Sequence, residues 1–450
     1  MVNPSPLICS RRFAPLLLTQ WGGAFNDNFF KSSLLIMFTY KNLELAQLSV
    51  NVVNNLVAAT LILPFLIFAA FAAQFADKYE KSGLIRVLKL AELCVMVAAA
   101  GAFWLGNTWL MLLALFCMGV QSACFSPLKY AILPQHIAED ELVAANSLLH
   151  AGTSLAIFMG LIGGSIAAQM PAGTVTVAGT GVVIALLGYW SSRAIPIAVS
   201  AAPELRVVFN PLQQYRRSFA HACENRMVFW SIIGISWYWF LGSVYLTQLP
   251  NLVRAVLGGA PPLVPLFFVC FFLGTCAGAA LTNRLSRGQI EPGLVPLGGV
   301  LISLVGCDLY WAASSYQLAY PLQPNAELIN VQLLLSRFEG LRVLFDFTLL
   351  GAVGGLFIVP LSALLQARTR ADSRAQVMGV NNFVNALFMI AAALISAIFL
   401  GLWNFSIAEL FGISALLNLL ILATMLLAVA EYWQRLCVRF FRAKESFYER

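Results

Sequence analysis

Charged residues are scarce in this chain of 450 residues. Lysine, arginine, aspartate and glutamate together make up 10% of it, whereas a soluble globular domain carries about 25%. Hydrophobic residues make up 60%, and the mean hydropathy is +0.82. So little charge cannot cover a surface that faces water, and we therefore expect an all-α integral membrane protein.

The sequence also lacks the motifs of common enzymes. Its three histidines, His136, His150 and His221, belong neither to an H-E-x-x-H metal motif nor to an H-x-x-x-x-D acyltransfer motif. There is no G-x-x-x-x-G-K-[ST] phosphate loop, which argues against an ATP-driven pump. The nine cysteines stand singly, without a C-x-x-C pair. We expect no enzyme activity, no cofactor and no metal site.

What the sequence does contain is a series of long apolar segments. Each has roughly 20 residues or more, which is enough to cross a bilayer as a helix. The segments lie near residues 13–40, 49–76, 84–105, 108–131, 143–169, 173–196, 226–250, 262–285, 293–314, 342–367, 376–402 and 405–433. We predict a multi-pass protein with twelve transmembrane helices.

Positive charge is distributed unevenly between these segments. If the N-terminus is cytoplasmic, most of the 27 lysines and arginines fall in cytoplasmic links or at the two ends. The links on the other side hold Lys41, Arg254, Arg337 and Arg342. This asymmetry predicts that both termini are cytoplasmic. We interpret the basic residues, and the net charge of +7, as topology signals and contacts with anionic bilayer lipids, not as a nucleic-acid surface.

The chain divides into two similar halves. We predict an N-terminal six-helix bundle over residues 1–196, a polar cytoplasmic linker over 197–225 and a C-terminal six-helix bundle over 226–450. Segment 125–133 resembles segment 358–366, and segment 76–83 resembles 282–288, in the same order in each half. Pseudo-symmetric halves around a site near the membrane midplane are typical of one large class of transporters. A polar insertion at about 315–340 contains an apolar stretch, 329–335, for which we predict a short interfacial helix.

The first predicted span contains polar residues that are costly in a membrane. A charge at mid-bilayer costs at least about 2.5 to 3.5 kcal/mol, so it usually faces a cavity or a partner. Asp27 and Lys31 lie one helical turn apart and could neutralise each other. Alternatively, Asn26, Asp27 and Asn28 line a central cavity, where they bind a polar headgroup or gate the halves. The pattern favours the second reading and leaves open whether Lys31 pairs with Asp27.

Other candidate residues lie in later spans. Pro127 and Pro360 occupy corresponding places in the two halves and predict paired helix bends. Further candidates for substrate binding or gating are Lys129, Tyr130, Asn146, Tyr245, Asn381 and Asn382. Tyr245 belongs to an aromatic group of span seven that packing alone also explains.

Three more charged residues have local explanations. Glu92 follows Lys89 at helical spacing, which predicts a local ion pair. Asp308 and Asp346 lie near the outer ends of their spans, where a wet interface would explain them.

The link after the second span carries a charged motif. Asp77, Lys78 and Arg86 fit in part the G-x-x-x-D-R/K-x-G-R-R/K signature of the major facilitator superfamily. In that family the acid and the arginine form a cytoplasmic latch. Here Ala73 stands in place of the leading glycine, and the loop carries Glu80 in addition.

Taken together, the sequence resembles the lysophospholipid transporter family of that superfamily. The residues that carry the resemblance lie at 20, 23–28, 76–86, 125–130, 145–146, 354–361 and 363–366. The resemblance implies the major facilitator fold and movement of lysophosphatidylethanolamine and lysophosphatidylglycerol to the cytoplasmic leaflet of a bacterial inner membrane. It makes Asp27, Asn28 and Lys129 the headgroup or gating residues. The chain lacks a fused acyltransferase, so a separate enzyme would re-acylate the lipid.

Two other functions remain open from the sequence. One is a proton-coupled exporter of hydrophobic drugs or metabolites, with Asp27 as the titrating carboxylate. The other is a non-transporting, lipid-binding scaffold for a membrane acyltransferase.

Overall fold

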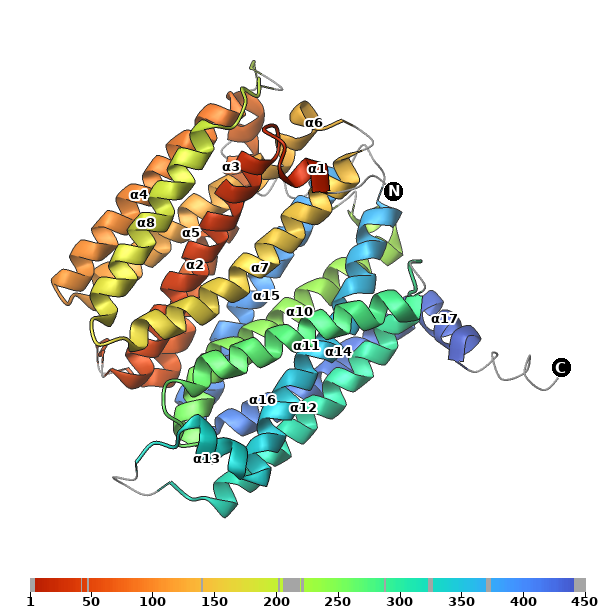
Figure 1. The fold of residues 1–450 in the computed structure, drawn as a ribbon. Coiled ribbons are helices and arrows are strands. Elements are labelled where there is room, and N and C mark those ends of the chain that lie inside the picture. Colours follow the sequence, from red (N-terminus) through yellow and green to blue (C-terminus); the bar gives the residue numbers. More distant parts are fainter. Residues whose placement is uncertain are drawn as a thin grey trace. The chain divides into compact units, whose positions relative to one another are not determined.

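A computed structural model describes residues 5–41, 43–46, 48–138, 141–200, 203–204, 219, 222–286, 289–322, 327–369 and 374–440. Within these ranges, helices of 21 to 31 residues make up most of the chain (Figure 1). They are α2 (Ala14–Tyr40), α3 (Val50–Lys78), α4 (Lys81–Trp104), α5 (Thr108–Ala131), α7 (Leu142–Gln169), α8 (Gly173–Arg193), α10 (Arg226–Asn251), α11 (Leu263–Ser286), α12 (Leu294–Ala319), α14 (Phe338–Arg368), α15 (Arg374–Ala397) and α16 (Ile407–Ala428).

These twelve long helices coincide with the twelve predicted spans. Among the described residues, ten helices are long and apolar enough to cross a membrane. The two long helices outside that set, α2 and α4, carry the buried charges Asp27, Lys89 and Glu92. The prediction of an all-α, multi-pass membrane protein is confirmed.

Shorter helices precede, join or follow the long ones. They are α1 (Ser5–Ile8), α6 (Leu133–His136), α13 (Val331–Ser336), α17 (Ala430–Phe440) and the π-helical turns η2 (Leu252–Val256) and η3 (Ile398–Leu402). The short helix predicted near 329–335 is confirmed as α13. The last predicted span, 405–433, is too long, because the extended backbone of Val429 (φ −131°, ψ 95°) ends α16 and separates it from α17.

The chain forms two compact units. Unit 1 comprises Met1–Leu48 and Leu56–Tyr215, and unit 2 comprises Ser49–Asn55 and Arg216–Arg450. In unit 2, Gln248 Nε2 donates to Asn55 Oδ1 (3.0 Å) and Asn251 Nδ2 donates to Asn51 Oδ1 (2.8 Å), which holds the first turns of α3. Most of the predicted linker 197–225 lies outside the described residues, so the predicted domain bounds stay a prediction.

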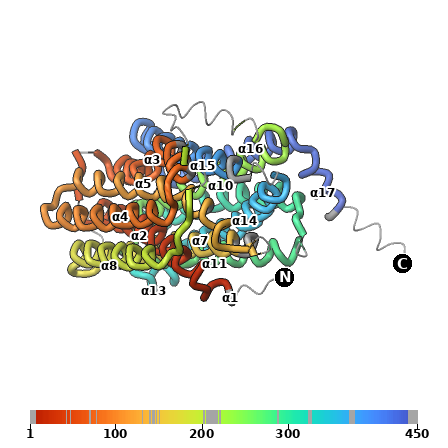
Figure 2. The backbone as a smooth tube through the Cα atoms, turned by 90° about the horizontal axis from the view of Figure 1, so that it is seen from above, coloured from red at the N-terminus to blue at the C-terminus, as the bar shows by residue number. Residues whose placement is uncertain are grey.

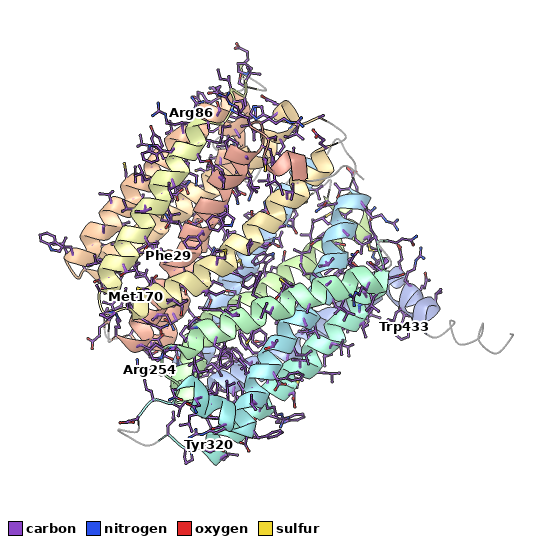
Figure 3. All side chains as sticks on the ribbon, viewed as in Figure 1. Phe29, Arg86, Met170, Arg254, Tyr320 and Trp433 are labelled. Atoms are coloured by element: carbon purple, nitrogen blue, oxygen red, sulfur yellow. The ribbon has the colours of Figure 1, made fainter. Side chains whose placement is uncertain are left out.

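Within unit 1, α2 packs against α5, α7 and α8 (Figure 2). Glycines of α7 allow close approach: a Cβ at Gly160 would lie 2.5 Å from the carbonyl oxygen of Phe25, and one at Gly164 would collide with that of Phe29. Ser33 Oγ donates to the Gly164 carbonyl (3.1 Å) across the same contact. Phe29 lies midway along α2, in the interior of the unit (Figure 3). The position of α2, which carries the candidate residues, is thus closely fixed.

Unit 2 is built by similar small-residue contacts. A Cβ at Gly278 of α11 would collide with the Ala352 carbonyl of α14. Asn418 of α16 donates to the Gly299 carbonyl of α12 (2.7 Å) and accepts from Trp237 Nε1 of α10 (2.8 Å). Trp237 is therefore a core residue, 5% exposed, which agrees with a packing role for this part of the aromatic group in span seven.

Candidate functional site

A buried ion pair anchors the polar interior of unit 1. Lys89 Nζ lies 2.6 Å from Glu92 Oε2, and both side chains are 1% exposed, which confirms the predicted local pair. The ammonium of Lys89 also lies 5.0 Å from the ring centroid of Phe125. A Cβ at Gly23 would lie only 2.5 Å from Lys89 Nζ, so the glycine makes room for the lysine beside α2. The pair is thus enclosed by α2 and α5.

Asn26 connects α2 to this pair. Its Nδ2 donates to Glu92 Oε1 (3.3 Å) and to the carbonyl of Gly181 in α8 (3.2 Å), and the residue is fully buried. Asn28 bonds within its own helix, where Nδ2 donates to the Ala24 carbonyl (2.9 Å). Consecutive residues on a helix point about 100° apart, so these neighbours of Asp27 have different surroundings.

Asp27 faces α5. Its Oδ2 accepts a hydrogen bond from Ser122 Oγ, while its Oδ1 is buried and has no hydrogen-bond partner among the described residues. Next to Ser122, Gln121 is 4% exposed, and its Nε2 likewise lacks a partner in the described part of the chain. We call Asp27, Gln121 and Ser122 the unit 1 polar site. It offers one unpaired acceptor and one unpaired donor, an arrangement that is costly unless a ligand or water satisfies it.

Lysines surround this site. Lys31 forms no ion pair within 4.0 Å in the described structure, although its charge acts on Asp27. Lys89 of α4 and Lys129 of α5 act on the same carboxylate. The question left open by the sequence is thereby answered: Lys31 is one of several cations near Asp27, not its contact partner.

The other predicted binding residues are spread over both units. In unit 1, Lys129 and Asn146 are half-buried, and the side chain of Tyr130 lies outside the described residues. In unit 2, Tyr245 is 2% exposed and donates to the Phe411 carbonyl (3.3 Å).

Two asparagines of α15 complete the predicted set. Asn381 is 6% exposed, and its Oδ1 has no hydrogen-bond partner within the described ranges. Asn382 is half-buried. Roles for these residues in binding or gating stay a prediction.

The two proline bends also stay a prediction. Pro127 lies within α5 and Pro360 within α14, and both helices continue past the proline. Each proline lacks the N–H that would bond the carbonyl four residues earlier, which weakens the helix at that point.

The link between α3 and α4 is fastened to the segment after α8. Lys81 Nζ donates to the Val199 carbonyl (2.9 Å), and Arg86 Nη2 donates to the Ile195 carbonyl (3.3 Å). Arg86 lies at one end of unit 1 (Figure 3). Lys78 stacks over Tyr79, with Nζ 5.7 Å from the ring centroid. The side chain of Asp77 is outside the described residues, so the latch itself remains a prediction.

Glu80 is the acid whose contacts are seen in this link. It accepts from the backbone N–H groups of Gly83 (2.7 Å) and Ala198 (3.1 Å), which caps α4 and holds the segment after α8. Burial raises the pKa of Glu80, but hydrogen bonds from Ser82, Ala198 and Gly83 together hold it below its ordinary value.

Sequence reasoning missed Ser122, Gln121 and the contacts of Glu80. A glutamine followed by a serine within an apolar span was the available signal for the first two. Glu80 departs from the latch motif, but an acid directly before the first turn of a helix is a typical capping residue, and this was the available signal for its contacts.

Unit 1 also contains an apolar pocket of about 460 Å³. Its lining residues come from α1, α2 and α7: Ile8, Leu17, Leu18, Trp21, Leu148, Ala151, Gly152 and Leu155. In unit 2, a smaller space of about 20 Å³ lies beside Tyr238 and Tyr245.

Comparison of the sequence with known proteins identifies similar families and relatives. The sequence model of the Major Facilitator Superfamily matches residues 16–323. Lysophospholipid transporter LplT of Salmonella paratyphi A and that of Salmonella typhimurium are each 26% identical over 424 residues, which cover 92% of this chain and 92% of the relative.

Solved structures agree on the fold. An auto-inhibited peptide transporter of the POT family superposes with a TM-score of 0.68 at 12% identity, covering 93% of this chain and 96% of the other. The human organic anion transporter MFSD10 gives 0.65 at 14% identity, covering 92% and 99%. A match over more than half of the chain, together with this fold, shows that the chain belongs to the major facilitator superfamily.

Proposed function

We propose that this chain is a transporter that moves lysophospholipids across a bacterial inner membrane, toward the cytoplasmic leaflet. Similarity to the LplT proteins along 92% of the chain supports this substrate class. The structural observation that carries the proposal is the unit 1 polar site, where a buried carboxylate keeps one oxygen without a partner among the described residues. A separate acyltransferase would re-acylate the delivered lipid.

The headgroup of lysophosphatidylethanolamine suits the groups of this site. Its ammonium can donate to Asp27 Oδ1 in a charge-assisted hydrogen bond. Its phosphate can accept from Gln121 Nε2 and interact with the charge of Lys31. The headgroup of lysophosphatidylglycerol is anionic and has no ammonium. Its glycerol hydroxyl groups can donate hydrogen bonds to Asp27 instead.

The single acyl chain needs an apolar surface. The pocket of about 460 Å³ is lined by carbon-rich side chains, and its size falls in the range of small-molecule sites. Trp21 of this lining lies on the same helix as Asp27, six residues earlier, which is about 9 Å along the axis. One acyl chain beside the lipid phase fits this surface.

The experiment is a leaflet-transfer assay with the purified protein in liposomes. Labelled lysophosphatidylethanolamine is followed between leaflets for wild type, Asp27→Asn and a control, Glu44→Gln, which changes an exposed acid shortly after α2. We expect Asp27→Asn to lower the transfer rate about tenfold or more, equivalent to about 1.4 kcal/mol, with folded protein retained, and Ser122→Ala to lower it less. Glu44→Gln should match wild type.

Other outcomes would contradict the proposal in distinct ways. Equal rates for wild type and Asp27→Asn would remove the unit 1 polar site from the transport path. Transport of a hydrophobic drug by the pure protein, without transfer of lysolipid, would favour an exporter. No transfer by the pure protein, with activity only beside an acyltransferase, would favour the scaffold function.

A further inference from the structure

Unit 2 contains a second set of charged residues, which the proposed substrate site does not use. Asp308 of α12 forms an ion pair with Arg342 of α14, whose Nε also lies 3.4 Å from Asp308 Oδ2. These two side chains are 39% and 37% exposed. Asp346 is only 3% exposed, so the expected wet interface is wrong for Asp346. We call Asp308, Arg342 and Asp346 the unit 2 triad.

The geometry leaves one carboxyl oxygen of Asp346 without a hydrogen-bond partner among the described residues. Arg342 and Asp346 lie one turn apart on the same face of α14, and Arg342 directs two nitrogens to Asp308. Asp346 Oδ2 is buried and has no hydrogen-bond partner among the described residues. Asp346 is eight residues inside the start of α14, or about 12 Å along the helix, which places it at membrane depth.

The helices packed around Asp346 supply no further compensating charge. The charged groups that act on it, within the described chain, are Asp308 from α12, which also shares a side-chain hydrogen bond with it, and Arg342 from its own helix. From α11, Phe271 packs on Phe347 with ring centroids 5.5 Å apart. The titratable neighbours of α14 farther along are Cys270 of α11, which bonds Thr348, and Tyr238 of α10, which lies against Gly354.

The unit 2 triad therefore contains one guanidinium and two carboxyl groups. If both are ionised, a net negative charge is left at membrane depth, where it is costly. A bound proton or a metal cation would remove that charge. The described residues hold no group of three metal-ligating side chains, whereas a proton needs only the one carboxyl oxygen.

We propose that Asp346 is a proton-binding site of unit 2. With the proton bound, the neutral carboxyl leaves Arg342 to pair with Asp308 across α12 and α14. When the proton leaves, the ionised Asp346 competes for Arg342 and weakens that pair. The site itself is argued from unit 2 alone, while its use in coupling lysophospholipid transport to a proton gradient rests on the proposed function.

The site is tested by infrared difference spectroscopy of the purified full chain in lipid nanodiscs, titrated with acid. We expect the stretching band of a protonated carboxyl group to appear on titration, to shift in D₂O and to be lost in Asp346→Asn. The control Glu339→Gln changes a half-buried acid of the same helix, near Tyr320, and should keep the band. Asp346→Glu, which keeps a carboxyl group, should retain a titrating band if Asp346→Asn fails to fold.

Loss of the band only in Asp346→Asn supports the site, and an unchanged band in that variant overturns it. Coupling is tested separately in liposomes with an imposed pH gradient. The rate of lysolipid transfer should respond to the gradient in wild type and in Glu339→Gln but not in Asp346→Asn. A gradient response retained in Asp346→Asn contradicts coupling through this residue, whereas a wild type with the titrating band but no lysolipid transfer contradicts the proposed function alone.

Discussion

Removing one partner of the buried pair in unit 1 should strongly destabilise the protein. In Lys89→Met, the carboxylate of Glu92 stays 1% exposed but loses its 2.6 Å contact with the ammonium. The donor that remains to it among the described residues is Asn26 Nδ2, at 3.3 Å. Breaking a buried pair in this way costs about 3 to 5 kcal/mol, because an uncompensated charge is left in the interior.

Removing both partners should cost much less. In the double variant Lys89→Met with Glu92→Met, no charge remains buried, and such replacements are often neutral or stabilising. Asn26 loses one acceptor but keeps the Gly181 carbonyl at 3.2 Å. The lost hydrogen bond should lower the free energy of unfolding by about 1 kcal/mol. The double variant should therefore be more stable than either single variant, by about 2 kcal/mol or more.

The assay is equilibrium unfolding of the purified protein in mixed detergent micelles, arranged as a double-mutant cycle. Arg193→Met is the matched control, since Arg193 is exposed at the end of α8 and should change the free energy of unfolding by less than about 1 kcal/mol. A double variant as unstable as the single variants, or single variants within about 1 kcal/mol of wild type, would refute the account of the buried pair.

Two further predictions concern packing and pH. Gly164→Val should destabilise unit 1 by about 1 to 3 kcal/mol, because its Cβ would collide with the Phe29 carbonyl, whereas Gly179→Ala, with open space around it, should be neutral or stabilise slightly. Thermal unfolding in detergent compares the two, and equal losses would contradict the packing argument. The lowered pKa of Glu80 means that its carboxylate contributes full stability above its ordinary pKa of 4.5 and loses that contribution as the pH falls through the lower folded-state value. The stability of wild type over Glu80→Gln should therefore shrink in acid, and a difference that does not change with pH would show that Glu80 is not the source.

Much of the fold was predictable because the bilayer restricts the choice of structure. A spanning segment must be apolar and must satisfy its backbone internally, so hydropathy located all twelve long helices. Hydropathy did not locate the end of the last long helix, α16, because residues 405–433 form one apolar segment. Apolar residues continue past Val429, and hydropathy does not register the extended backbone there.

The candidate site was predictable only where contacts are local in sequence. The Lys89–Glu92 pair follows from spacing along one helix. The contact of Ser122 with Asp27 joins residues 95 positions apart, and it depends on which face of α5 turns to α2. The burial of Asp346 likewise depends on how α14 meets α12, which a single sequence does not specify.

The placement of the buried pair on one helix has a consequence for synthesis of the protein. A charged residue at the centre of an inserting helix costs about 2.5 to 3.5 kcal/mol, and each partner of a pair within one helix can lower that cost for the other. α4 can therefore leave the insertion machinery with its charges already neutralised. Asp27 must wait, because its hydrogen-bond donor Ser122 lies in α5, which is synthesised later. The hydrogen bonds of α2 are therefore complete only after α5 has been synthesised.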